Sequence, residues 1–195
     1  MITTGSGADV IVYNLGDGHD TVNVSNGLDN TVSIGMAKYI DLLFGKSGND
    51  LQLKVGAGQI DFKDWYAPGA NHSVKTLQVV IEGTSDYNAA GDALHNKKVE
   101  QFDFNGLANA YDQARAANPA LNAWAISGAL LNFHLGGSDT AALGGDLAYQ
   151  YAKNGNLGNI SMTPAQGILG SAQFGTANQA LQSAAALQDL SPRLM

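Results

Sequence analysis

Two consecutive glycine-rich copies of one short pattern open the chain. Residues 4–12 read TGSGADVIV and residues 15–23 read LGDGHDTVN. In each copy small residues precede an aspartate, and an apolar residue, Ile11 or Val22, follows two places after it. This is the spacing of the nonapeptide G-G-x-G-x-D-x-U-x, in which a tight turn leads into a short strand. The two copies predict successive turns and strands with Ile11 and Val22 directed inward.

A third copy of the pattern is degraded. The turns of the first two copies depend on residues that tolerate a positive φ. Residues 26–32 read NGLDNTV, so Asn30 occupies the place of the acid and Asp29 comes one place early. The repeats are therefore expected to end here. Glycines that permit a positive φ recur in the two good copies: Gly5, Gly7, Gly16 and Gly18.

Turns of this kind offer oxygen ligands, which a hard cation such as Ca²⁺ requires in numbers of about six to eight. If alternate turns share an edge, Asp9 lies beside Asp29 or Asn30, while Asp20 lies beside an absent upstream turn or the loop near Asp41. The alternative is that the aspartates only cap tight turns. The candidate calcium ligands are Gly5, Gly7, Asp9, Gly16, Asp17, Gly18, Asp20, Asp29 and Asn30.

Composition limits the classes of function. The net charge is −7 and only 14% of residues are charged, which argues against nucleic acid or an anionic membrane as a partner. The chain has no cysteine, so neither disulfides nor a thiolate zinc site can stabilise it. Its start inside a repeat, with no visible signal peptide, indicates a fragment of a longer protein.

Beyond the repeats, the pattern predicts hairpins and then helices. Residues 39–44, 51–55, 59–62 and 73–82 are expected strands, and 51–55 alternates strictly as a half-buried strand does. Trp65 is expected to close the core. Four helices are expected after the strands. Helical spacing predicts the first two from the apolar residues Phe104, Leu107, Ala108 and Tyr111, and from the stripe Leu121, Trp124, Gly128, Leu131 and Leu135. The third is expected from Ser138 to Asn154, with Leu143, Leu147 and Tyr151 inward, and the fourth from Thr163.

Several of these runs resemble the C-terminal region of RTX proteins, the haemolysin-type calcium-binding family. The resemblance covers roughly residues 4–82 and lies in GDGHDTV at 16–22, SGNDL at 47–51 and FKDWY at 62–66. A run at 136–151 and the last forty residues are similar to the tails of large RTX proteins and to their type I export signal. The degraded third copy departs from the family pattern.

The resemblance and the periodicities together predict an α+β fold. We expect a truncated parallel β-roll that continues into an antiparallel capping sheet, followed by a bundle of about four short helices. The expected divisions are terminal β-roll turns at 1–35, the antiparallel capping segment at 36–98, a helical segment at 99–162, and a helical tail with the secretion signal at 163–195.

The function implied is a calcium-binding capping and folding module of a bacterial RTX protein that folds after type I export. Its partners would be calcium ions, the secretion apparatus and the upstream repeats, with a membrane or host surface reached only through the parent protein. The alternatives are a calcium-stabilised adhesion module that binds a glycan or host protein, for instance at Trp65 and Tyr66, or the tail of a lipase or protease. The four histidines match no catalytic motif, so no enzyme activity is expected.

Overall fold

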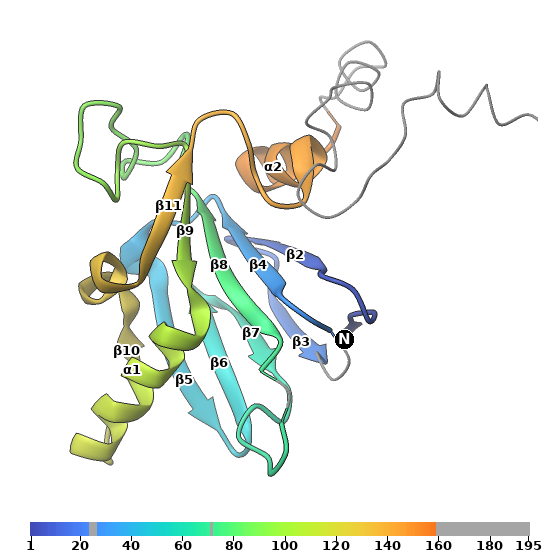
Figure 1. The fold of residues 1–195 in the computed structure, drawn as a ribbon, viewed down its shortest axis with the longest axis vertical. Helices are drawn as coiled ribbons and strands as arrows, with labels where there is room; N and C mark the ends of the chain where they lie inside the picture. The colour runs from blue at the N-terminus through green and yellow to red at the C-terminus, as the bar shows by residue number, and fades with distance from the viewer. Residues whose placement is uncertain (24–26, 71, 159–195) are drawn as a thin grey trace, which may run out of the picture.

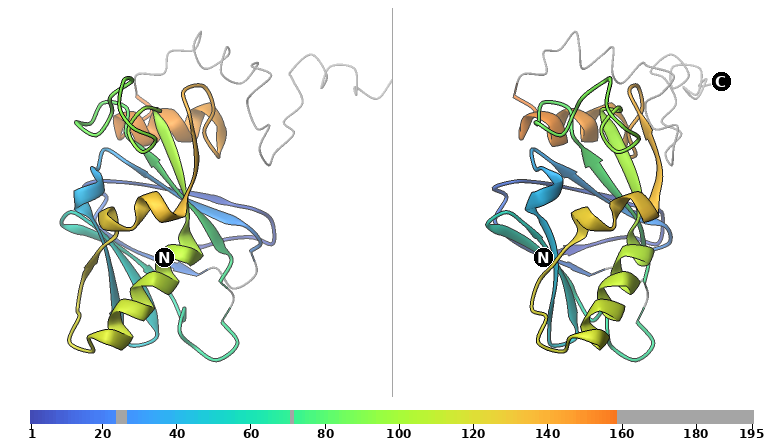
Figure 2. Two further views of the ribbon diagram at one scale, coloured as in Figure 1. Left: turned by 60° about the vertical axis from the view of Figure 1, so that its left-hand side comes forward. Right: turned by 90° about the vertical axis from the view of Figure 1, so that its left-hand side faces the viewer.

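A computed structural model describes residues 1–23, 27–70 and 72–158 of the 195-residue chain. Within these residues, strands form two mixed sheets, with one α-helix near each end of them (Figures 1 and 2). Sheet A has the order β1 (Ile2–Thr3), β3 (His19–Asn23), β7 (Gly58–Phe62), β6 (Asp50–Val55), β5 (Leu42–Ser47) and β10 (Trp124–Ala125). Sheet B has the order β11 (His134–Ser138), β9 (Val99–Asp103), β8 (Val74–Val80), β4 (Asn30–Gly35) and β2 (Val10–Asn14).

The glycine-rich region supplies strands to the two sheets in turn. β1 and β3 belong to sheet A, whereas β2 and β4 belong to sheet B. The pairs β1–β3 and β3–β7 are parallel, as are β2–β4 and β4–β8. The pairs among β5, β6 and β7, and those among β8, β9 and β11, are antiparallel.

This topology contradicts the predicted fold class, because the described residues contain neither a parallel β-roll nor a four-helix bundle. The hairpins after β4 do not form a separate cap. β7 and β8 return to the N-terminal strands and pair with β3 and β4. Parallel and antiparallel strands therefore share both sheets. Repeat spacing predicts local turns and strands, but it does not identify which distant strand completes each sheet.

The core between the sheets follows the alternation seen in the sequence. Ile11 is 6% exposed and Val22 is fully buried, as predicted. In β6 the exposure alternates along the whole strand, with Leu51, Leu53 and Val55 buried, which confirms the half-buried strand. Three-residue helix η1 (Tyr39–Asp41) replaces the beginning of the strand expected at 39–44.

Helix α1 (Phe104–Ala117) confirms the first predicted helix. The four residues that define its apolar face are all buried in the main core: Phe104, Leu107, Ala108 and Tyr111. Asp103 caps the helix, because its carboxylate accepts the Gly106 N–H at 3.0 Å. Trp65 is 4% exposed and packs edge-on against the Phe104 ring, with ring centroids 5.5 Å apart, so its predicted place in the core is also confirmed.

The remaining helix predictions are wrong or lie outside the described residues. The stripe at 121–135 forms β10, two short 3-10 helices, η2 (Ile126–Gly128) and η3 (Leu130–Phe133), and part of β11. Leu131 and Leu135 are 66% and 61% exposed, so the stripe is not a buried face. The helix expected from Ser138 begins only at Gly145, and the one expected from Thr163 lies outside the described residues.

Helix α2 (Gly145–Asn154) lies over one face of sheet B, where its buried Ala152 packs in an apolar cluster with Val80 and Val99, and polar contacts add to this attachment. A Cβ at Gly35 would lie 1.9 Å from the Ala152 carbonyl oxygen, so only glycine allows this approach. Gln78 accepts the Leu143 N–H at 2.7 Å, just before the helix. The helix ends as predicted, because Gly155 at its C-terminus has a φ of 71°.

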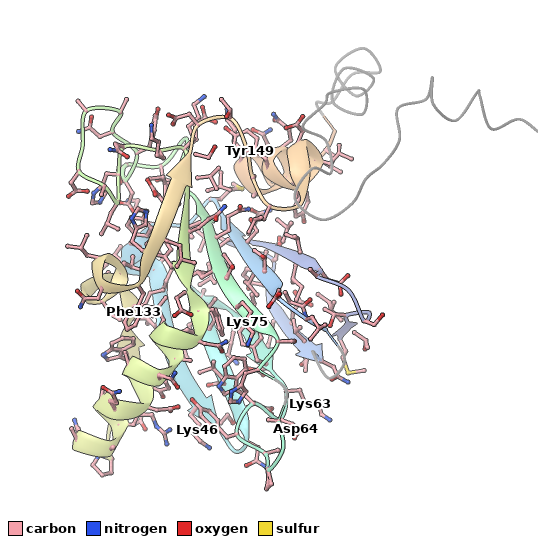
Figure 3. All side chains as sticks on the ribbon, viewed as in Figure 1. Lys46, Lys63, Asp64, Lys75, Phe133 and Tyr149 are labelled. Atoms are coloured by element: carbon pink, nitrogen blue, oxygen red, sulfur yellow. The ribbon has the colours of Figure 1, made fainter. Side chains whose placement is uncertain are left out.

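Glu82 joins α2 to the loop before β9. Its carboxylate lies 2.9 Å from the Lys98 ammonium and 2.8 Å from that of Lys153, and it accepts the Tyr149 hydroxyl. Burial alone would raise the pKa of Glu82, but these donors outweigh it and lower the pKa to about 2. Figure 3 shows Tyr149 on α2, above the upper end of sheet B.

Candidate functional site

The first glycine-rich turn contains a carboxylate oxygen without a partner. Asp9 lies at the end of this turn, immediately before β2, and its Oδ2 atom is buried with no hydrogen-bond donor among the described residues. A Cβ added at Gly5 would lie 3.9 Å from this oxygen, so the turn passes close to it. The turn also borders a cavity of about 330 Å³ between β1 and β2, lined by Ile2, Thr3, Thr4, Gly5, Asp9, Val10, Ile11 and Val12.

Asn30 lies directly beside Asp9, as the alternate-turn argument expected. Because β2 and β4 are parallel with Val10 opposite Thr31, the residue before β2 and the first residue of β4 are neighbours. The Asn30 side-chain oxygen accepts the Asp9 N–H at 2.8 Å. Its amide nitrogen donates to the Ser73 hydroxyl at 3.1 Å and lies 3.4 Å from the Thr4 hydroxyl. Asn30 is fully buried, and its amide therefore connects three chain segments.

The second glycine-rich turn is occupied by contacts from the protein itself. The Asp17 carboxylate accepts the Asn14 N–H at 2.8 Å, and the Asp17 N–H returns to the Asn14 carbonyl at 3.0 Å. The Gly18 carbonyl accepts both the Tyr13 hydroxyl at 2.6 Å and the Gln59 N–H at 2.8 Å. Gly16 and Gly18 have φ values of 104° and 93°, which confirms the positive-φ turn in the second copy. Gly5 and Gly7 do not have a positive φ, so the same prediction is wrong for the first copy.

Two further predicted ligands are set apart from these groups. Asp20 lies opposite Ile60 of β7, not beside Asp41, and its carboxylate forms no hydrogen bond or ion pair with the described residues. Asp29 is exposed with a φ of 55°, a conformation that aspartate tolerates better than most residues. The structure thus brings Asp9 and Asn30 together and leaves Asp20 and Asp29 outside that group.

Asp9 satisfies part of what a calcium site needs. An unpartnered buried carboxylate oxygen beside a glycine-rich turn fits a hard cation, because it supplies charge and the turn can supply carbonyl oxygens. Within the described ranges, however, no three His, Asp or Glu side chains gather closely enough to hold a metal by themselves. Backbone carbonyls and water would have to complete the coordination around Asp9. The ligand set from the sequence stays a prediction.

A buried acid–imidazole pair escaped the sequence analysis. His134 lies in β11, and its Nε2 atom is 2.7 Å from Oε2 of Glu100. The Glu100 side chain is fully buried, and its other oxygen accepts the Lys97 N–H at 3.1 Å. Burial raises the pKa of Glu100 above its usual value. The two residues are 34 positions apart, and only the β9–β11 pairing brings them together.

His19 and Asp61 form a second pair, on the outer face of sheet A. The His19 side chain is 61% exposed, and its Nε2 lies 2.7 Å from Oδ2 of Asp61. The other Asp61 oxygen accepts the Gln59 and Gln52 amides at 2.6 and 3.0 Å. All oxygens of Asp61 are thus engaged, which makes this pair a less suitable cation site than Asp9.

Comparison with protein-family models and with curated protein sequences finds no match. The resemblance to RTX proteins therefore rests on the motifs quoted above. No helix within residues 1–23, 27–70 and 72–158 is long and apolar enough to cross a membrane.

Proposed function

We propose that the chain is a calcium-binding module whose folding is coupled to uptake of a cation at the first glycine-rich turn. The observation that carries this proposal is the Asp9 Oδ2 atom, which is buried without a hydrogen-bond donor among the described residues. An anionic oxygen out of contact with water costs free energy unless a donor or a cation compensates it. Calcium would supply that compensation, with Asp9 as the charged ligand.

The contrast between the turns favours the first as the principal site. At the second turn, a cation would compete with the Asn14 N–H for Asp17 and with two donors for the Gly18 carbonyl. At the first turn, Asp9 Oδ2 has no such competitor among the described residues. We therefore expect calcium to bind with higher affinity at Asp9 than at Asp17 or Asp20.

Coupled binding and folding would suit a protein exported before it folds. A ligand that binds only the folded state stabilises it in proportion to RT ln(1 + [L]/Kd), so little free calcium leaves the chain unfolded and millimolar calcium favours the fold. Membership of a secreted RTX protein, type I export and contact with upstream repeats are further proposals, supported by the resemblance in the sequence. The export signal would fall at 163–195, outside the described residues.

Calcium titration of the Asp9→Asn and Asp17→Asn variants tests the proposal. Isothermal titration should detect calcium binding to the wild type, and millimolar calcium should raise its Tm by roughly 5–10 °C at 100-fold excess over Kd. Asp9→Asn should lose most of both effects, whereas Asp17→Asn should keep them. Magnesium is the control ion, because it prefers a tighter octahedral shell. An equal Tm in EDTA and in calcium would refute the proposal.

The adhesion alternative gains no support at the expected aromatic residues. Trp65 is 4% exposed and its ring stacks on His72 at 4.3 Å, so it is part of the core. Tyr66 is half-buried, and its hydroxyl donates to Asp112 at 3.0 Å. These contacts do not form an exposed aromatic cleft.

A further inference from the structure

Strand β11 lies against a buried carboxylate. Among the described strands it pairs only with β9, so it is an edge of sheet B. The Glu100 side chain on β9 is fully buried, and its Oε2 atom lies 2.7 Å from Nε2 of His134 on β11. A Cβ added at Gly137 would overlap the same oxygen, so only glycine lets the β11 backbone pass this close. β11 thus forms one wall of the space that holds the carboxylate.

Apart from this contact, β11 is attached weakly. None of its five residues is fully buried, and Leu135 is 61% exposed. Its ladder with β9 has a register shift between His134 and Gly136. The His134 ring reaches the core, where it lies tilted against the buried Phe102 with ring centroids 5.5 Å apart. An edge strand with so little buried surface opens at a low free-energy cost, so the contact with Glu100 supplies a large share of its attachment.

Glu100 and His134 form a seam pair that needs one proton to be neutral. That proton resides either on the imidazole, beside an ionised carboxylate, or on the carboxylic acid, beside a neutral imidazole. Without it, a fully buried carboxylate faces a neutral ring, and a buried charge without a cationic partner costs free energy. Burial accordingly raises the pKa of Glu100, although the bonds from His134 and from the Lys97 N–H oppose this. The folded state therefore holds the proton more tightly than the unfolded chain does.

Other titratable groups surround the seam pair without supplying a cation to the carboxylate. They come from η1, from the loop before β9 and from the end of β11: Tyr39, Asp86, Tyr87, Asp92, His95, Lys97 and Asp139. The Tyr39 hydroxyl donates to the Leu94 carbonyl at 2.6 Å, and burial raises its pKa, so it stays neutral. Asp86 accepts the Tyr39 N–H at 2.7 Å.

The two neighbouring basic side chains are engaged by other carboxylates. Lys97 Nζ lies 2.9 Å from Asp139, and His95 Nδ1 lies 2.5 Å from Asp92. Among the described residues, His134 is thus the one cation-forming side chain within hydrogen-bond distance of the buried carboxylate. Loss of the proton from the seam pair is therefore not compensated by its surroundings.

We propose that the seam pair is a pH-dependent latch: β11 stays against β9 while the pair holds its proton, and opens more often once the pair releases it. The direction follows from linkage. A carboxyl group with a raised pKa in the folded state adds stability below its ordinary pKa, and that stability is lost as the pH rises through the folded value. β11 should thus be best protected in mildly acid solution. The latch involves neither glycine-rich turn, so this inference is independent of the proposed calcium site.

Amide hydrogen exchange of β11 tests the latch, with exchange times corrected for the intrinsic rate at each pH and calcium held constant. Between about pH 5 and about pH 8.5, the protection of residues 134–138 should fall roughly tenfold, as the release of one proton per molecule allows. β6, which is paired on both sides in sheet A, is the internal control and should keep its protection. Constant protection of β11 over this range would overturn the inference.

Glu100→Gln should abolish the pH dependence, because the amide has a similar volume and does not ionise. His95→Gln is the matched control, since it removes a nearby histidine outside the seam pair and should leave the dependence unchanged. A Glu100→Gln variant whose β11 responds to pH as the wild type does would contradict the role of the pair. Loss of the response in His95→Gln would also contradict it.

Imidazole NMR resonances of the wild-type protein give a readout that does not depend on whether the Glu100→Gln variant folds. The His134 ring resonance should titrate at the pH at which the protection of β11 falls. His134→Gln identifies this resonance and should move the fall to lower pH, because a neutral amide replaces the cation. A loss of β11 protection without any change at His134, or an unshifted profile in His134→Gln, would refute the latch.

Discussion

The first and second glycine-rich turns are similar in sequence and differ in their surroundings. Both precede a strand and both contain an aspartate after small residues. In the first turn the Asp9 Oδ2 atom has no donor among the described residues, whereas in the second Asp17 and the Gly18 carbonyl accept hydrogen bonds from Asn14, Tyr13 and Gln59. The motif predicts the turn, but neighbouring segments decide whether its oxygens are available to a ligand.

The largest effect is expected where the first turn meets its buried neighbour. Asn30→Leu has a similar volume but removes the acceptor of the Asp9 N–H and the donor to Ser73. Removing the acceptor of the Asp9 N–H and the buried bond to the Ser73 hydroxyl should lower the free energy of unfolding by about 2–4 kcal/mol. Urea denaturation measures this loss.

Asp29→Gly is the control for that substitution, because Asp29 is exposed and has a φ of 55° that glycine adopts readily. Its stability should stay within about 0.5 kcal/mol of the wild type or rise slightly. If Asn30→Leu were as stable as the wild type, the buried amide would not be what joins the first turn to β4.

A smaller effect is expected at the second turn. Asp17→Ala removes the acceptor of the Asn14 N–H and should cost about 1 kcal/mol, as the loss of a side-chain cap usually does. Because this role involves no cation, the loss should be the same in EDTA and in calcium. Thermal unfolding in both buffers checks it, and a loss seen only in calcium would assign Asp17 to the metal.

Tyr13→Phe tests the other contact that occupies the second turn. Tyr13 is 2% exposed, and its hydroxyl is one of two donors to the Gly18 carbonyl. The Gln59 N–H remains after the substitution, so the loss should be about 0.5–1.5 kcal/mol, with the ring packing preserved. If calcium affinity rose in this variant, the freed carbonyl would be acting as a ligand.

The smallest effect is expected at Asp20, which occupies the aspartate position of the repeat motif in the second copy. The Asp20 carboxylate forms no hydrogen bond or ion pair with the described residues, and Asp20→Asn should change stability by less than about 0.5 kcal/mol. Differential scanning calorimetry in EDTA and in calcium tests this. A loss of the calcium-dependent Tm shift here, with Asp9→Asn unaffected, would reverse the comparison between the turns.

Local patterns were predicted better than distant pairings. The apolar face of α1, the alternation in β6 and the end of α2 at Gly155 were correct because short-range periodicity and backbone φ preferences determine them. The helix predicted at 121–135 was wrong, because the pairing of β10 with β5 and of β11 with β9 overrode the helical spacing of this segment. The Glu100–His134 pair carries no local signal at all.

The amino-acid sequence alone determined the turns, the inward positions of Ile11 and Val22, and the exclusion of disulfides and thiolate metal sites. These follow from residue types and spacings over a few positions. Tertiary structure decided that β7 and β8 return to pair with β3 and β4, and that Asn30 stands beside Asp9. It also decided which turn keeps an unpartnered carboxylate, because hydrogen-bond donors reach the second turn from Tyr13 and from the distant Gln59.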